Sequence, residues 1–120
     1  MVTVSIIDDD EDSNMILSFY LEDKWQVTTF LDWKEALEAY EKGPPDLIFL
    51  DISLPGIDGT EVLKKIRDKQ QLKHVKVIAL TGYSLPGDRE KFLSLGFDEY
   101  VSKPIPDMKT LTKLVEKCLR

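Results

Sequence analysis

The most constraining feature of this 120-residue sequence is a regular alternation between two hydrophobic patterns. Short β-branched runs, typical of buried strands, alternate with stretches in which apolar residues recur every three to four positions, as in helices. The predicted strands cover residues 2–7, 25–30, 46–50, 75–80 and 97–101. Strict alternation of this kind predicts a parallel sheet with helices packed on both of its faces.

A helix is expected after each predicted strand, and several residues indicate where these helices begin and end. The first covers residues 13–22, Asp32 caps a second that runs to Lys42, Asp58 starts the third, and Ser84 or Asp88 opens the fourth. Gly96 is expected as the C-cap of the fourth helix, and Pro106 in the first turn of the last one. Five such β-α units predict a flavodoxin-like, doubly wound α/β fold with strand order 2-1-3-4-5.

The composition narrows the class of protein. A chain of this length with 42% hydrophobic residues can bury one core, and the net charge of −6 argues against a general nucleic-acid binder. The single Cys118 cannot form an internal disulfide. No signal peptide is recognisable, and no apolar run approaches the roughly 20 residues of a membrane helix. We expect a cytoplasmic domain over residues 1–120, with no output domain and no nucleic-acid or membrane partner.

Polar residues follow the predicted strands at the edge of the sheet where ligands bind in parallel α/β folds. Asp8 and Asp9 follow the first strand and Asp51 the third, while Thr81 and Lys103 follow the fourth and the fifth. Strands one and three are neighbours about 4.8 Å apart, so three carboxylates should meet. Their mutual repulsion favours either protonation or a bound cation.

An all-oxygen site of this kind suits Mg²⁺, for which Mn²⁺ could substitute. The hydroxyl of Thr81 and the ammonium group of Lys103 would complete a set of partners for a phosphoryl group. We expect Asp51 to lie between the acid pair Asp8 and Asp9 on one side and Thr81 and Lys103 on the other. Asp51 is therefore the expected nucleophile, because a carboxylate can itself attack phosphorus. Each residue alone also has an ordinary explanation, as a helix cap, a strand end or a solvent-exposed side chain.

The same positions carry a resemblance to a known family over essentially the whole chain. Its motifs are IIDDD at residues 6–10, FLDISLPGIDG at 49–59, IALTG at 78–82 and YVSKP at 100–104. In these motifs, and in the spacing between the aspartate, threonine and lysine, the sequence resembles the CheY-like receiver domain of two-component response regulators.

The resemblance implies a phosphorelay signalling switch, not an enzyme that turns over a small molecule. Asp51 would accept a phosphoryl group from a phosphohistidine of a histidine kinase or a histidine phosphotransfer protein. The chain would then catalyse only its own phosphorylation and dephosphorylation. Mg²⁺ would be ligated by Asp9, Asp51 and the backbone carbonyl of Ser53, with Asp8 assisting. Lys103 would pair first with a carboxylate and then with the phosphoryl group.

The resemblance also implies a conformational change. Thr81 would move to hydrogen-bond a phosphoryl oxygen, and the ring of Tyr100 would turn inward as it does so. A downstream protein would read the change on the face formed by the fourth helix, the fifth strand and the fifth helix. The bond between Lys103 and Pro104 is expected to be cis.

Two further expectations concern phosphoryl lifetime and docking. Ser53 and Tyr83 occupy the positions that tune the lifetime in the family, and we hypothesise that the Tyr83 ring shields the acyl phosphate from water. The first helix, which carries Met15 and Phe19, docks a phosphotransfer partner in related proteins.

Three other functions stay open. A phosphatase of haloacid dehalogenase type would need a second aspartate two residues after the nucleophile, where this chain has Ser53. A flavodoxin-like FMN carrier would need a Ser/Thr/Gly-rich phosphate loop where this chain has acids at residues 8–10. A receiver-like binding module that is never phosphorylated would not need the complete set of Asp51, Thr81 and Lys103.

Overall fold

A computed structural model of the chain describes residues 2–82 and 84–120. Within them one parallel sheet has the order β2-β1-β3-β4-β5, which confirms the predicted fold. Its strands are β1 (Thr3–Ile7), β2 (Gln26–Phe30), β3 (Leu47–Asp51), β4 (Lys76–Thr81) and β5 (Glu99–Ser102). Tyr83, predicted to tune the phosphoryl lifetime, lies outside the described residues.

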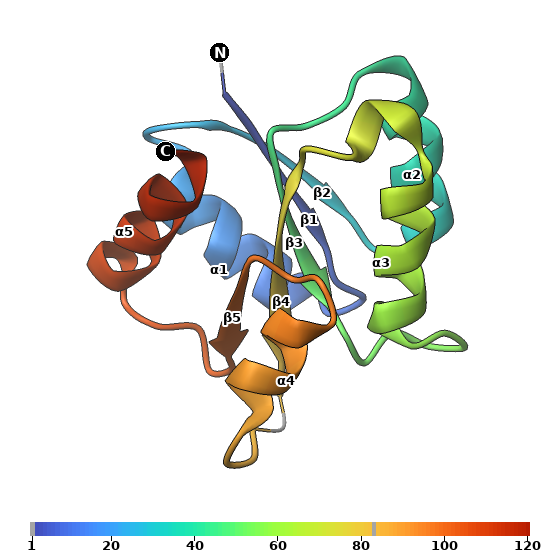
Figure 1. Cartoon of the computed structure of the whole chain (residues 1–120). Helices are drawn as coiled ribbons and strands as arrows, with labels where there is room; N and C mark the ends of the chain where they lie inside the picture. The colour runs from blue at the N-terminus through green and yellow to red at the C-terminus, as the bar shows by residue number, and fades with distance from the viewer. Residues whose placement is uncertain (1, 83) are drawn as a thin grey trace.

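Helices cover both faces of the sheet (Figure 1). They are α1 (Glu11–Leu21), α2 (Trp33–Lys42), α3 (Gly59–Asp68), α4 (Asp88–Ser94) and α5 (Met108–Leu119), with a short 3₁₀ turn at Gln70–Leu72. Buried residues of α1 and α5 pack on one face of the sheet, and those of α2, α3 and α4 pack on the other. No helix among the described residues is long and apolar enough to cross a membrane.

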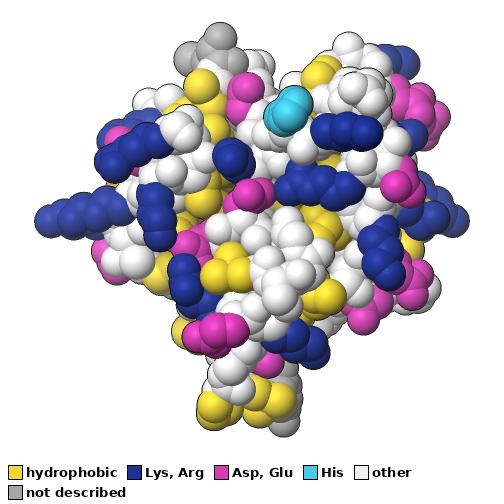
Figure 2. All heavy atoms as spheres, viewed as in Figure 1, with side chains coloured by type: hydrophobic (Ala, Val, Ile, Leu, Met, Phe, Trp, Pro, Cys, Tyr) yellow, Lys and Arg dark blue, Asp and Glu magenta, His cyan; other side chains and the backbone are white. Residues whose placement is uncertain are grey.

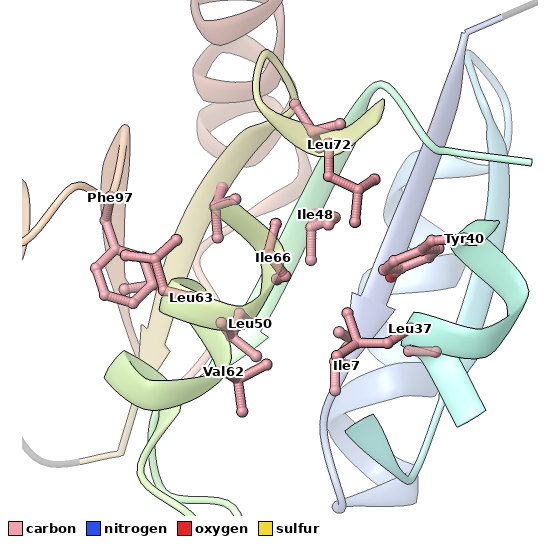
Figure 3. Packing of buried hydrophobic residues seen from close by; sticks show 14 of the residues in the cluster. Ile7, Leu37, Tyr40, Ile48, Leu50, Val62, Leu63, Ile66, Leu72 and Phe97 are labelled. Carbon is pink, nitrogen blue, oxygen red and sulfur yellow. The ribbon is translucent and has the colours of Figure 1, made fainter. Parts of the chain in front are cut away.

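The central strand β3 explains why the sheet separates two cores. All its residues are buried, as expected for a parallel strand covered on both sides. Ile48 and Leu50 belong to the core under α2 and α3, whereas Leu47 and Phe49 belong to the core under α1 and α5. Figure 3 shows side chains of the core under α2 and α3, which converge from β1, α2, β3 and α3. Among them are Ile7, Leu37, Tyr40, Ile48, Leu50, Val62 and Ile66.

Aspartates cap four of the five α-helices that the structure describes, and α4 is the exception. Asp32 accepts a hydrogen bond from the Lys34 N–H at 2.9 Å, and Asp58 accepts one from the Thr60 N–H at 2.8 Å, so both predicted caps are confirmed. Helix α1 begins earlier than expected because Asp10 caps it. Part of the acidic run is therefore helix start, where negative charge is favoured.

Three predicted boundaries need correction near the carboxyl end of the chain. Pro106 precedes α5 and is not in its first turn, because Asp107 caps the helix and accepts a hydrogen bond from the Thr110 N–H at 3.2 Å. Strand β5 begins at Glu99, later than expected. Helix α4 begins at Asp88, one of the two predicted starts, and its C-cap is Leu95. Gly96, the expected cap, follows with φ of 111°, a conformation that favours glycine.

Candidate functional site

The carboxyl ends of four strands meet at one edge of the sheet, in the lower part of Figure 1. Asp8 directly follows β1, and Asp51 is the last residue of β3. Thr81 is the last residue of β4, and Lys103 directly follows β5. The parallel sheet thus places at one edge the residues that are far apart in the sequence.

Three carboxylates form a compact cluster at this edge, as expected. One carboxylate oxygen from each of Asp8, Asp9 and Asp51 lies within 4.8 Å of the other two. Asp8 is fully buried and Asp51 is 4% exposed, whereas Asp9 is exposed to solvent. The cluster therefore has two buried acids and one acid through which an ion could enter from water.

Lys103 is the cation that lies against these acids. Its Nζ is 2.9 Å from Asp8 Oδ2 and 3.6 Å from Asp51 Oδ2. Burial alone would lower the pKa of Lys103, but the two carboxylates raise it above its usual value. Its ammonium group therefore stays charged and balances one of the three acids. The peptide bond between Lys103 and Pro104 is cis.

Asp51 is the acid whose protonation is most altered by its surroundings. Burial raises the pKa of Asp51 to about 6; Asp8 contributes to this rise, while the Ser53 N–H and Lys103 oppose it. The Ser53 N–H donates to Asp51 Oδ1 at 2.8 Å. A cation bound nearby would favour the charged form of this carboxylate.

The loop that carries Asp8 is fixed by hydrogen bonds that the sequence did not reveal. The side chain of Asn14, buried in α1, donates from Nδ2 to the Asp8 carbonyl oxygen at 2.8 Å. The Asp10 N–H donates to Asp8 Oδ1 at 3.0 Å. An asparagine inside a helix usually faces solvent, so only its position one turn after the acidic run could have indicated this role.

Gly59 allows the loop after Asp51 to fold back against the end of β3. A Cβ atom at this position would lie 2.4 Å from Ile52 Cα and 2.9 Å from the Asp51 carbonyl oxygen. The Gly59 N–H also donates to the Ile52 carbonyl oxygen at 3.0 Å. The start of α3 can approach the site this closely only because residue 59 has no side chain.

The two predicted switch residues lie on neighbouring strands. Thr81 is buried at the end of β4, and Tyr100 is partly buried on β5. The Tyr100 hydroxyl donates to Ser84 Oγ at 2.7 Å. Its ring stacks on Phe92 of α4, with ring centres 5.6 Å apart and planes inclined by 13°.

Helix α1 exposes apolar side chains at the surface. Met15 is 68% exposed and Phe19 is 62% exposed. Both line a groove of about 520 Å³ that is completed by Leu31, just beyond β2. These residues are therefore available to a partner.

Comparisons with known proteins agree with the fold and the acidic cluster. The model of the response regulator receiver domain family matches residues 4–116. An uncharacterised 14.6 kDa protein of Leptolyngbya boryana is 32% identical over 117 residues, which cover 97% of this chain and 89% of that protein. The polar-differentiation response regulator DivK of Brucella ovis is 44% identical over 71 residues, which cover 59% of this chain and 58% of DivK.

A solved structure extends the likeness over nearly the full chain. The chemotaxis protein CheY4 of Vibrio cholerae superimposes with a TM-score of 0.89 at 28% sequence identity, covering 99% of both chains. Receiver domains typically act as switches in two-component signalling and are not classical enzymes. The family match over residues 4–116 and the shared fold show that this chain belongs to the response regulator receiver domain family.

Proposed function

We propose that this chain is a phosphorelay switch that accepts a phosphoryl group at Asp51 from the phosphohistidine of a histidine kinase or a phosphotransfer protein. The observation that carries the proposal is the setting of the Asp51 carboxylate. Its Oδ1 accepts a hydrogen bond from the Ser53 N–H, and its Oδ2 lies 3.6 Å from Lys103 Nζ. Asp51 also shares the cluster with Asp8 and Asp9, and Lys103 contacts both Asp8 and Asp51.

The proposed transfer uses the charged form of Asp51. A carboxylate oxygen forms a bond to phosphorus while the bond between phosphorus and the imidazole nitrogen breaks, and the electron pair of that bond returns to the imidazole. The ammonium group of Lys103 can then donate to a phosphoryl oxygen, and the Thr81 hydroxyl can donate to another. In self-dephosphorylation, water attacks phosphorus and the Asp51 carboxylate leaves.

The acid cluster fits Mg²⁺, and Mn²⁺ could substitute. Three carboxylate oxygens lie within 4.8 Å of one another and one ammonium group balances only one of them, a donor set and charge that suit a hard divalent cation. Asp9, Asp51 and the Ser53 carbonyl would hold the ion, with Asp8 assisting. When bound, the ion would offset the negative charge of the carboxylates and the phosphoryl oxygens.

The proposed conformational response runs from the site to β5. Thr81 would move toward the phosphoryl group, and Tyr100 would leave its hydrogen bond with Ser84 and turn inward. A downstream protein would then read the altered face of α4, β5 and α5. The phosphodonor would dock on α1, where Met15 and Phe19 are exposed.

Labelling with a small phosphodonor tests the phosphoacceptor. In the presence of Mg²⁺ and an acyl phosphate, we expect the native protein to become labelled and Asp51→Asn to stay unlabelled. Asp12→Asn is the matched control, since it removes an exposed acid of α1 outside the cluster. Label retained in Asp51→Asn would contradict the assignment, and a native protein that takes no label would favour the unphosphorylated binding module.

A further inference from the structure

Helix α4 is attached to the rest of the protein by few side chains. Of its seven residues only Phe92 is buried. A second attachment is the guanidinium group of Arg89, whose Nε lies 3.0 Å from Glu99 Oε1 and whose Nη2 lies 3.1 Å from Glu99 Oε2. Two parallel contacts of this kind fix the orientation of the helix as well as its distance from β5.

Glu99 is a buried charge of β5 that contacts both α4 and α5. The residue is 4% exposed, and besides Arg89 of α4 its carboxylate lies 3.4 Å from Lys117 Nζ of α5. The Tyr100 N–H donates to its Oε1 at 3.2 Å. Burial alone would raise the pKa of Glu99, but these donors lower it below its usual value. The Arg89 side chain is half exposed, but its separation from so buried a carboxylate still costs free energy, because Glu99 then keeps only Lys117 and the Tyr100 N–H.

The next residue along β5 is Tyr100, which holds α4 in a second way. Its ring stacks on Phe92, and its hydroxyl reaches Ser84 in the segment before the helix. Two consecutive residues of β5 thus contact α4: Glu99 pairs with the charge of Arg89, and the Tyr100 ring stacks on Phe92. A movement of Tyr100 that displaces α4 must therefore disturb both the contact with Phe92 and the pair of Glu99 with Arg89.

We propose that Glu99 is a positioning residue that, through Arg89, holds α4 and Tyr100 in the arrangement seen here and so opposes the switch. This inference rests on the proposed function, in which Tyr100 moves on phosphorylation. An interaction present in one state and lost in the other shifts the equilibrium by its own free energy. Figure 2 shows basic and acidic side chains interspersed over the viewed side of the molecule.

The test measures how tightly each variant binds beryllofluoride in the presence of Mg²⁺, a mimic of a phosphoryl group on a carboxylate. We expect Glu99→Gln and Arg89→Gln to bind it roughly threefold to tenfold more tightly than the native protein. Arg89→Lys, which keeps the charge but loses one contact, should lie between them and the native protein. Lys113→Gln removes an exposed cation of α5 on the same face and should leave the affinity unchanged.

A double variant separates this role from a merely structural one. Glu99→Gln combined with Arg89→Gln should bind no more tightly than Glu99→Gln alone, because the loss of the Glu99 carboxylate already removes its interaction with Arg89. In the absence of beryllofluoride, the Tyr100 ring signals of the single variants in NMR spectra should move toward the bound positions. A structural role alone would lower the melting temperature without these effects.

Two results would overturn the inference. Unchanged or weaker binding in Glu99→Gln and Arg89→Gln would show that the pair does not oppose the switch, while the proposed phosphoacceptor would stand. A native protein that neither binds beryllofluoride nor takes label would instead remove the proposed function, and this inference with it.

Discussion

Among the single residues, Asp51 combines two requirements that conflict. Its proposed chemistry needs a charged carboxylate, yet the protein buries it beside Asp8. Lys103 lies closer to Asp8 than to Asp51, so it relieves this conflict only in part. Burial and the repulsion from Asp8 leave an unfavourable free energy at Asp51, which a cation bound at the cluster would reduce.

Replacing Asp51 by asparagine should therefore stabilise the metal-free protein at neutral pH. Because the pKa of Asp51 is raised from 3.8 to about 6 on folding, its charged form disfavours the native state above pH 6 and has no such effect below pH 4. We expect the free energy of unfolding of Asp51→Asn to exceed that of the native protein by up to about 3 kcal/mol at pH 7.5.

The measurement is urea denaturation in a chelator at several pH values. The advantage of Asp51→Asn should shrink as the pH falls from 6 to 4, as the native aspartate takes up its proton. An equal difference at pH 7.5 and pH 4 would show that the carboxylate charge is not its cause.

The residues of the site were predictable to the extent that strand ends determine them. Asp8, Asp51 and Lys103 follow directly from a parallel sheet whose carboxyl ends share one edge. Asn14 and Glu99 were not found, because a polar residue within a helix or a strand is normally solvent-exposed. Their burial depends on partners in other elements, which no local pattern reveals.

At the scale of elements, the junction of β3 and α3 is the tightest part of the site. Gly59 is helical, and alanine is a better helix former than glycine by about 1 kcal/mol. Propensity alone would therefore predict that Gly59→Ala stabilises the protein. The 2.4 Å approach of a Cβ to Ile52 Cα predicts the opposite, because backbone cannot move aside without shifting Asp51.

We expect Gly59→Ala to lower the free energy of unfolding by about 2 kcal/mol or more, the cost of overpacking. Gly43→Ala is the matched control, since a Cβ there meets nothing within 4 Å and should change stability by less than about 0.5 kcal/mol. Urea denaturation of both variants checks the prediction. A Gly59→Ala protein as stable as the native one would mean that the junction can relax.

Helix boundaries were predictable where a side chain caps its own helix. Asp32 and Asp58 do so, and their role follows from residue type and position. The prediction that Pro106 lies in the first turn of α5 was wrong, although proline suits that position. Asp107 accepts a hydrogen bond from the Thr110 N–H, so α5 begins at Met108. Two suitable residues side by side compete, and only the packing of α5 decides between them.

At the scale of the whole molecule, binding of an ion at the acid cluster would be coupled to folding. Asp9 and Asp51 come from segments far apart in the sequence, so the cluster exists only when β1 and β3 are paired. The unfolded chain has no such site, and an ion that binds it stabilises the entire domain.

Mg²⁺ should therefore raise the melting temperature of the native protein. At a free concentration tenfold above the dissociation constant, the gain is about 1.4 kcal/mol, or about 4 to 7 °C for a domain of this size. Asp9→Asn should lose this shift, whereas Asp12→Asn should keep it. Calorimetry with and without the ion checks both, and an equal shift in Asp9→Asn would place the ion elsewhere.

Of residue, element and whole molecule, the fold of the whole molecule was predicted best from the sequence. Alternating strand and helix patterns, right-handed crossovers and a chain of this length leave the observed strand order as the best solution. The division of β3 between two cores follows from the alternation of side chains along a strand. What the pattern could not supply was the attachment of α4, because a helix with one buried residue has almost no hydrophobic period.

The gathering of the site from four strand ends also bears on synthesis. As the chain leaves the ribosome, Asp8 and Asp51 emerge well before Lys103, which follows the last strand. Until β5 has joined the sheet, the paired carboxylates lack the ammonium group that lies 2.9 Å from Asp8 in the finished protein. A nascent chain thus cannot assemble the site before β5 and Lys103 have left the ribosome and joined the sheet.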